Sequence, residues 1–108
     1  MKKRISLQNA EADLKKRLEN PEFRKAYEYE RAMVALAQKI AELRDASRMK
    51  QADLAAKLGV SQQFVSQLET GRSRNLTLQT LIKVAASLGC GVEITFPRSS
   101  RPALKVRP

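Results

Sequence analysis

Residues 50–71 read KQADLAAKLGVSQQFVSQLETG, and their pattern predicts two short helices joined by a tight turn. Apolar residues recur at the three-to-four spacing of helices that pack on one side: Leu54, Ala55 and Leu58, then Phe64 or Val65, and Leu68. Gly59 can end the first helix, because glycine adopts the left-handed conformation without a steric penalty. Ser61 can cap the second helix, since its hydroxyl accepts a hydrogen bond from a free backbone N–H.

The outer face of the second helix is polar but uncharged, and it carries Gln62, Gln63, Ser66 and Gln67. Glutamine presents a donor and an acceptor on one planar amide, which suits an adenine edge in the major groove. A helix-turn-helix places this part of its second helix against base edges. The alternative is a set of ordinary solvent-facing residues. Three glutamines on a capped helix in a basic chain favour base reading, and the sequence predicts all four residues as base contacts.

This stretch resembles the helix-turn-helix of the lambda-repressor-like regulators, the XRE or Cro/C1 type. The residues that match in register are Gln51, Leu54, Ala55, Leu58, Gly59, Val60, Val65 and Leu68. The resemblance covers about residues 32–88 and implies that Gln62, Gln63 and Gln67 touch bases while Gln51 braces a phosphate. Arg48 departs from the pattern, because many relatives have glycine there, so the resemblance does not define the shape of this turn.

The same resemblance implies an ion pair between Arg44 and Glu69. This pair would link the helix that ends near Ser47 to the second helix of the motif, which is the recognition helix. We also assign phosphate contacts to Lys50, Ser61 and Thr70. The basic loop after Gly71 adds Arg72 and Arg74, which could reach phosphates. One of them could instead enter the minor groove, or both could be solvated loop arginines. Phosphate contacts give affinity and register rather than sequence choice.

Composition limits the possible functions. The chain has 108 residues, enough for one domain, and a net charge of +10, which favours a polyanion such as nucleic acid. It has one cysteine, Cys90, and no histidine, so we expect no disulfide, no metal site and no cofactor. No nucleophile–base constellation is evident, which argues against an enzyme. There is no membrane-spanning run and no secretory signal, so we expect a prokaryotic cytoplasmic protein, associated with the nucleoid when bound to its operator.

The N-terminal third extends beyond what the repressor family needs. Residues 1–20 form a basic arm with a weak amphipathic helix, and Asn20 followed by Pro21 marks the start of a helix that runs to about Ser47. Phe23, Tyr27 and Tyr29 must bury somewhere in this extension. They could pack on the protein itself or on a sister subunit, or they could form a docking surface for another protein.

The C-terminal part begins with a helix over residues 78–88, which Thr77 can cap. Residues 92–96 alternate as a strand does, with Val92, Ile94 and Phe96 on one side. A lone strand leaves its backbone groups unpaired, so we expect it to pair with the same strand of a second subunit. Residues 97–108 contain three prolines, four basic residues and no acidic residue, and we expect a flexible basic tail.

The sequence therefore predicts an all-α, lambda-repressor-like helix-turn-helix domain over residues 21–96. An N-terminal helical extension precedes it, and a short C-terminal β-strand pairs across a dimer. The expected function is a homodimeric, sequence-specific repressor that binds double-stranded DNA at a palindromic operator. The segment from Asn20 to Tyr27 and the C-terminal strand are similar to HigA-type antitoxins. That similarity implies a type II toxin–antitoxin operon, in which the chain neutralises a small mRNA-cleaving toxin and represses its own promoter. The alternative is a stand-alone XRE-family or phage-type repressor without a toxin.

Overall fold

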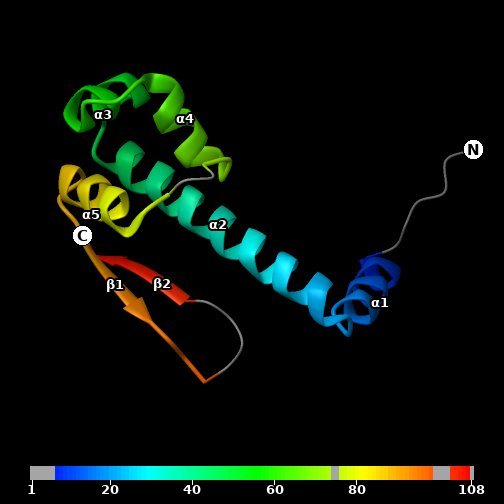
Figure 1. Cartoon of the computed structure of the whole chain (residues 1–108). Coiled ribbons are helices and arrows are strands. Elements are labelled where there is room, and N and C mark those ends of the chain that lie inside the picture. Colours follow the sequence, from blue (N-terminus) through cyan, green and yellow to red (C-terminus); the bar gives the residue numbers. More distant parts are fainter. Residues whose placement is uncertain (1–6, 74–75, 99–102, 108) are drawn as a thin grey trace, which may run out of the picture.

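The computed structural model describes residues 7–73, 76–98 and 103–107. The helices are α1 (Leu7–Arg17), α2 (Pro21–Ala46), α3 (Gln51–Leu58), α4 (Gln62–Thr70) and α5 (Leu78–Ser87), and the strands are β1 (Gly91–Thr95) and β2 (Ala103–Arg107) (Figure 1). The predicted class, an all-α helix-turn-helix domain with an N-terminal helical extension, is confirmed.

The hydrophobic core lies between α3, α4, α5 and the C-terminal half of α2. Its buried members are Leu36, Ile40, Leu54, Ala55, Val65, Leu68, Leu81, Val84 and Leu88. The sequence allowed either Phe64 or Val65 as the inward residue of α4. Val65 is fully buried, whereas Phe64 packs half-buried at the edge of the core. The predicted apolar faces of α3 and α4 are thus the faces that hold these helices together.

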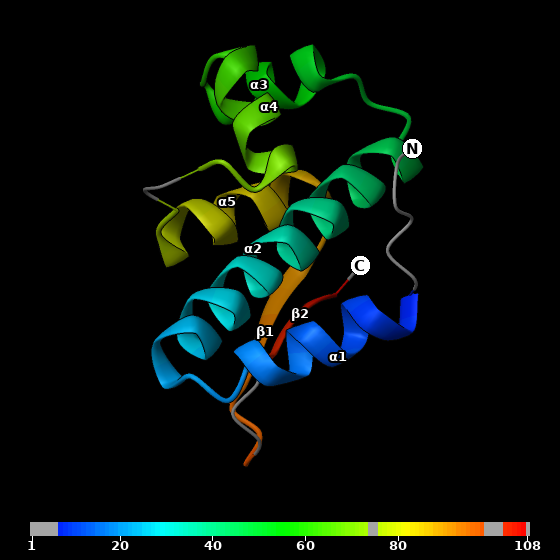
Figure 2. The same cartoon turned by 90° about the vertical axis from the view of Figure 1, so that its right-hand side faces the viewer.

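Helix α2 is one continuous helix of 26 residues, which the sequence had left open. It starts where the Oδ1 atom of Asn20 accepts a hydrogen bond from the backbone N–H of Glu22 at 3.0 Å, with Pro21 in the first turn. Its buried residues all lie in the C-terminal half. The N-terminal half projects from the helical bundle, and α1 lies at its far end without any buried residue (Figures 1 and 2).

The turn after α2 has the bond pattern that ends many helices on a left-handed residue. The N–H of Arg48 donates to the carbonyl of Asp45 at 2.9 Å, and the N–H of Met49 donates to the carbonyl of Arg44 at 3.2 Å. Arg48 has a φ of 56°, so it takes the conformation that suits glycine. The three other helices that end in this way do so on glycines with similar positive φ angles: Gly59, Gly71 and Gly89.

Two expectations about the C-terminus differ from the structure. The strand expected to be alone, β1, pairs antiparallel with β2 of the same chain, with Val92 opposite Val106 and Ile94 opposite Leu104. The segment expected to be a flexible tail contains β2. The physical reason is that β2 satisfies backbone groups on one edge of β1 within the chain, so a sister subunit is not needed for that edge. The hairpin is anchored to the helices, because β1 contacts α5 and β2 contacts α2 (Figure 2).

Candidate DNA-binding site

The orientation of α4 is fixed at both ends and along its inner face. At its start, the Oγ atom of Ser61 accepts a hydrogen bond from the N–H of Phe64 at 3.1 Å. At its end, Gly71 is left-handed and the N–H of Arg72 donates to the carbonyl of Gln67 at 3.0 Å. The inner face is buried through Val65 and Leu68, so α4 can present only its opposite face to a ligand.

That opposite face carries the residues predicted to read bases. Gln62, Gln63 and Gln67 are exposed, whereas Ser66 is half-buried. All four lie on α4, and the glutamine amides face solvent from a helix that cannot rotate. Such a surface can form paired donor and acceptor contacts with base edges.

An ion pair joins α2 to α4. The Nε atom of Arg44 donates to Oε2 of Glu69 at 2.6 Å, and Nη2 donates to Oε1 at 3.0 Å. Both side chains are shielded, with 16% and 5% of their surfaces exposed. These hydrogen bonds to Glu69 raise the pKa of Arg44, so its guanidinium stays charged. The pair therefore acts as a fixed brace between α2 and the recognition helix, α4.

The same brace reaches α3 and the turn before it. Arg44 donates from Nη1 to the carbonyl of Met49 at 2.6 Å, and the Nε2 atom of Gln51 donates to Oε1 of Glu69 at 3.2 Å. Gln51 was predicted as a phosphate contact. The structure shows that its amide also belongs to the network that holds α3 against α4.

The other predicted phosphate contacts lie at two helix ends. Lys50 is exposed just before α3, where its N–H donates to Oδ2 of Asp53 at 2.8 Å. Thr70 and Arg72 are exposed at the end of α4, and the Thr70 hydroxyl donates to the carbonyl of Gln67 at 3.2 Å. Arg74 lies outside the described residues. From the sequence, Arg48 was only a departure from the family pattern, whereas the structure places it exposed in the same turn as Lys50.

Comparison with known proteins identifies the domain. Residues 40–94, just over half of the chain, match the family model described as helix-turn-helix. The chain belongs to the XRE-type helix-turn-helix family. It is a sequence-specific DNA-binding regulator of transcription and not an enzyme.

Two similar proteins support this assignment. An uncharacterized HTH-type transcriptional regulator of Sinorhizobium fredii, y4dJ, is 41% identical over 63 residues, which are 57% of this chain and 80% of that protein. The crystal structure of the restriction-modification controller protein C.AhdI from Aeromonas hydrophila is 33% identical, with a TM-score of 0.50. That match covers 54% of this chain and 86% of the controller protein.

The family match does not include the projecting half of α2, where the aromatic residues predicted to contact a partner lie. The rings of Phe23 and Tyr27 are nearly parallel, with centroids 6.3 Å apart and an interplanar angle of 19°. Tyr29 is 64% exposed. The structure brings Phe23 and Tyr27 together on α2. Tyr29 does not join them, and Tyr27 and Tyr29 line two separate hollows.

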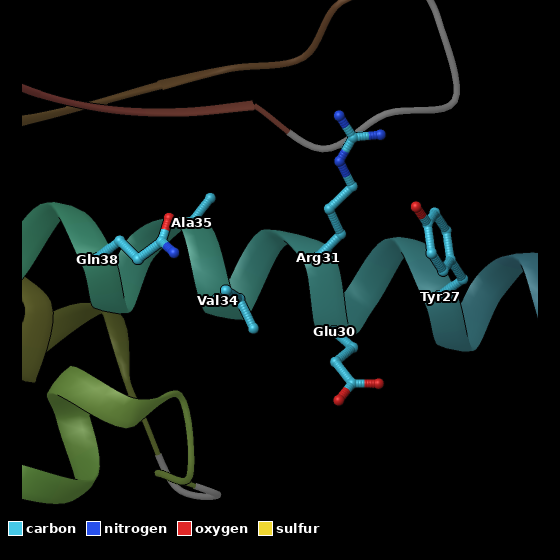
Figure 3. A pocket seen from close by; sticks show the side chains of 6 residues that line it. All are labelled: Tyr27, Glu30, Arg31, Val34, Ala35 and Gln38. Carbon is cyan, nitrogen blue, oxygen red and sulfur yellow. The ribbon is translucent and has the colours of Figure 1, made fainter. Parts of the chain in front are cut away.

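Two hollows flank this part of α2. One hollow, of about 390 Å³, is lined by six residues of α2: Tyr27, Glu30, Arg31, Val34, Ala35 and Gln38 (Figure 3). The other, of about 830 Å³, is lined from α2 by Ala26, Tyr29, Glu30 and Met33 and from the end of α4 by Gly71, Arg72 and Ser73. The second hollow therefore connects the projecting half of α2 to the end of the recognition helix.

The residues predicted to form a dimer strand lie in different surroundings. Val92 is half-buried and packs against the core, whereas Ile94 is 43% exposed and Phe96 is 92% exposed.

In the part of the chain that the structure describes, no helix is long and apolar enough to cross a membrane. No group of three potential metal ligands occurs among these residues either.

Proposed function

We propose that this regulator reads its operator through Gln62, Gln63 and Gln67, with Ser66 beside them, and represses transcription as a homodimer on a palindromic site. The observation that carries the proposal is the exposed glutamine face of α4, a helix that is capped, packed and braced to α2. Two such helices in a dimer would enter major grooves about one DNA turn apart. Because glutamine pairs well with adenine, each half-site should contain adenine-rich steps such as ACAA.

The test is a binding selection on DNA with randomised half-sites. Gln62→Ala should relax the base preference at one position by about 1–3 kcal/mol, because one bidentate contact is lost. Gln38→Ala, an exposed glutamine on α2, is the matched control and should leave the preference unchanged. Arg72→Ala should weaken binding to all sequences alike. An unaltered preference in the Gln62→Ala protein would remove the base-reading role.

For the homodimer, α5 offers an exposed apolar surface outside the core. Leu78 and Ile82 lie one helical turn apart and are 54% and 51% exposed, and Ala86 is exposed one turn further. No charged residue interrupts this row, so a second copy of α5 could cover it and bury apolar surface. The predicted strand contact through Ile94 is the alternative, and it would use the edge of β1 away from β2.

Two matched substitutions separate these dimer surfaces. Ile82→Glu should convert the dimer to a monomer in analytical ultracentrifugation, because a charge would be buried at the α5 contact. Ile94→Glu should leave the dimer intact. The reverse result would assign the dimer contact to β1, and a monomeric wild-type protein would contradict the homodimer.

A second candidate function is that of an antitoxin, and the projecting half of α2 favours it. This half contributes nothing to the core of the domain, yet it carries exposed Tyr29 and lines two hollows. Aromatic residues exposed on a rigid element are typical of protein interfaces. The proposed occupant is a small mRNA-cleaving toxin.

The antitoxin role predicts a specific partner encoded beside the gene. Co-expression with each flanking reading frame should recover a small protein in stoichiometric complex, and that protein should arrest growth when expressed alone. Tyr29→Ala should weaken the complex, whereas Arg24→Ala, on the same exposed half of α2, is the control. Recovery of the homodimer alone would leave a stand-alone regulator.

A further inference from the structure

Arg48 occupies a backbone conformation that disfavours its own side chain. Its φ of 56° is positive, and it is the one residue other than glycine with a positive φ among those that the structure describes. The equivalent positions at the ends of α3, α4 and α5 are all glycine. A strained residue is retained only where something compensates, and such residues cluster at functional sites.

Hydrogen bonds hold the turn around Arg48, so the direction in which its side chain leaves the backbone is defined by the fold. On its C-terminal side, the carbonyl of Met49 accepts a hydrogen bond from the side-chain Nη1 of Arg44 at 2.6 Å, and the N–H of Met49 donates to the backbone carbonyl of Arg44 at 3.2 Å. The Met49 side chain packs against the core. Arg48 is exposed in this turn, as are Ser47 and Lys50, whereas Met49 points inward.

The guanidinium of Arg48 is available for a ligand. Within the described part of the chain it makes no ion pair, although Asp45 lies three residues earlier. The nearby carboxylate of Asp53 accepts the N–H of Lys50. Arg48 also lies two residues before Lys50 and three before α3, at the same helix end as the predicted phosphate contacts Lys50 and Gln51.

We propose that Arg48 binds a phosphate of the DNA backbone beside the start of α3. A guanidinium can bind a phosphate through two parallel hydrogen bonds, which glycine could not do. The contact would contribute affinity and register but no sequence preference. The proposal rests on the DNA binding of the family and not on which bases the glutamines read.

The test compares Arg48→Gly with the wild-type chain on a random-sequence duplex over a range of salt concentrations. Loss of one phosphate contact should reduce the slope of log affinity against log salt by about 0.9. The ratio of wild-type affinity to Arg48→Gly affinity should then fall about 3.5-fold between 50 and 200 mM salt. The melting temperature of the variant should be unchanged or higher, since glycine relieves the strain.

The control is Arg24→Ala, which removes the same charge about 35 Å away along α2. It should leave the slope near that of wild type. Arg48→Asn, which tolerates the left-handed conformation without a charge, should behave as Arg48→Gly does, and Arg48→Lys should retain most of the slope. If Arg48→Gly and Arg48→Asn keep the slope of the Arg24→Ala protein, Arg48 does not contact phosphate and serves only to end α2.

Discussion

Replacing Glu69 with alanine should strongly destabilise the domain, because it breaks the shielded ion pair between α2 and α4. Glu69 accepts two hydrogen bonds from Arg44 and one from Gln51, and only 5% of its side chain is exposed. Its removal would leave the guanidinium of Arg44, itself 16% exposed, without its charge partner. Breaking a fully buried pair in this way costs about 3–5 kcal/mol. The partial exposure of Arg44 places the expected loss near the lower end, at about 3 kcal/mol.

The assay is urea denaturation followed by circular dichroism, supported by thermal melting. A loss of about 3 kcal/mol should lower the melting temperature by roughly 15 °C in a domain of this size. Gln51→Ala keeps the pair and should cost about 1 kcal/mol or less. Glu42→Ala is the control, because Glu42 is an exposed carboxylate on α2, and it should change stability by about 0.5 kcal/mol or less.

A double-mutant cycle with Arg44→Ala isolates the pair itself. We expect a coupling energy of about 2 kcal/mol between Arg44 and Glu69, because both single changes remove the same two hydrogen bonds. Because the pair raises the pKa of Arg44, this energy is fully present below the unfolded-state pKa of arginine. It should therefore stay constant from neutral to moderately alkaline pH. Additive single effects, or a cost below about 1 kcal/mol for Glu69→Ala, would refute the brace.

Four further stability predictions follow from the helix ends and the core, each measured by urea denaturation. Arg48→Gly should stabilise the chain by up to about 1 kcal/mol, because relief of left-handed strain, about 1–2 kcal/mol, exceeds the entropic cost of glycine, about 0.5–1 kcal/mol. Gly59→Ala should instead destabilise the chain by about 1–2 kcal/mol. The cost would come from backbone conformation alone, since no atom lies within 4 Å of the added Cβ. If Arg48→Gly and Gly59→Ala changed the stability equally, the left-handed strain at Arg48 would be contradicted. Ser61→Ala should cost about 1 kcal/mol by removing the cap of α4, and Ser61→Asn should restore most of it. Leu54→Ala should cost about 3 kcal/mol, because the side chain is 0% exposed and a cavity would remain, whereas half-buried Leu58→Ala should cost clearly less.

The helix-turn-helix could be predicted because several local signals agreed. The apolar spacing of Leu54, Val65 and Leu68 selected the inner faces, and Gly59 and Ser61 marked the turn between the helices. All five residues adopt the expected roles in the structure. Such signals act over a few residues, so a single sequence is enough to locate them.

The hairpin could not be predicted because its two strands are separated by a proline-containing segment. The prolines and basic residues of the tail argued for disorder, although Leu104 and Val106 alternate as strand residues do. The strand pairing depends on how the chain turns between Thr95 and Ala103, which the periodicity of either strand does not report. Arg48 shows the same limit, since the backbone angle that makes it unusual is set by Met49 and Arg44 around it.

The continuity of α2 has a mechanical consequence. Its first half contributes no buried residue to the core, whereas its second half is joined to α4 through the pair of Arg44 and Glu69. A partner bound to the first half is therefore held in a fixed orientation relative to the recognition helix. Inserting one residue near Val34 would rotate the outer aromatic face by about 100° relative to the DNA-facing surface. A seven-residue insertion would bring the two faces back to within about 20° while lengthening the arm by about 10 Å. The length of α2 thus sets the angle, about the helix axis, between a partner bound to its outer half and the DNA groove that α4 enters.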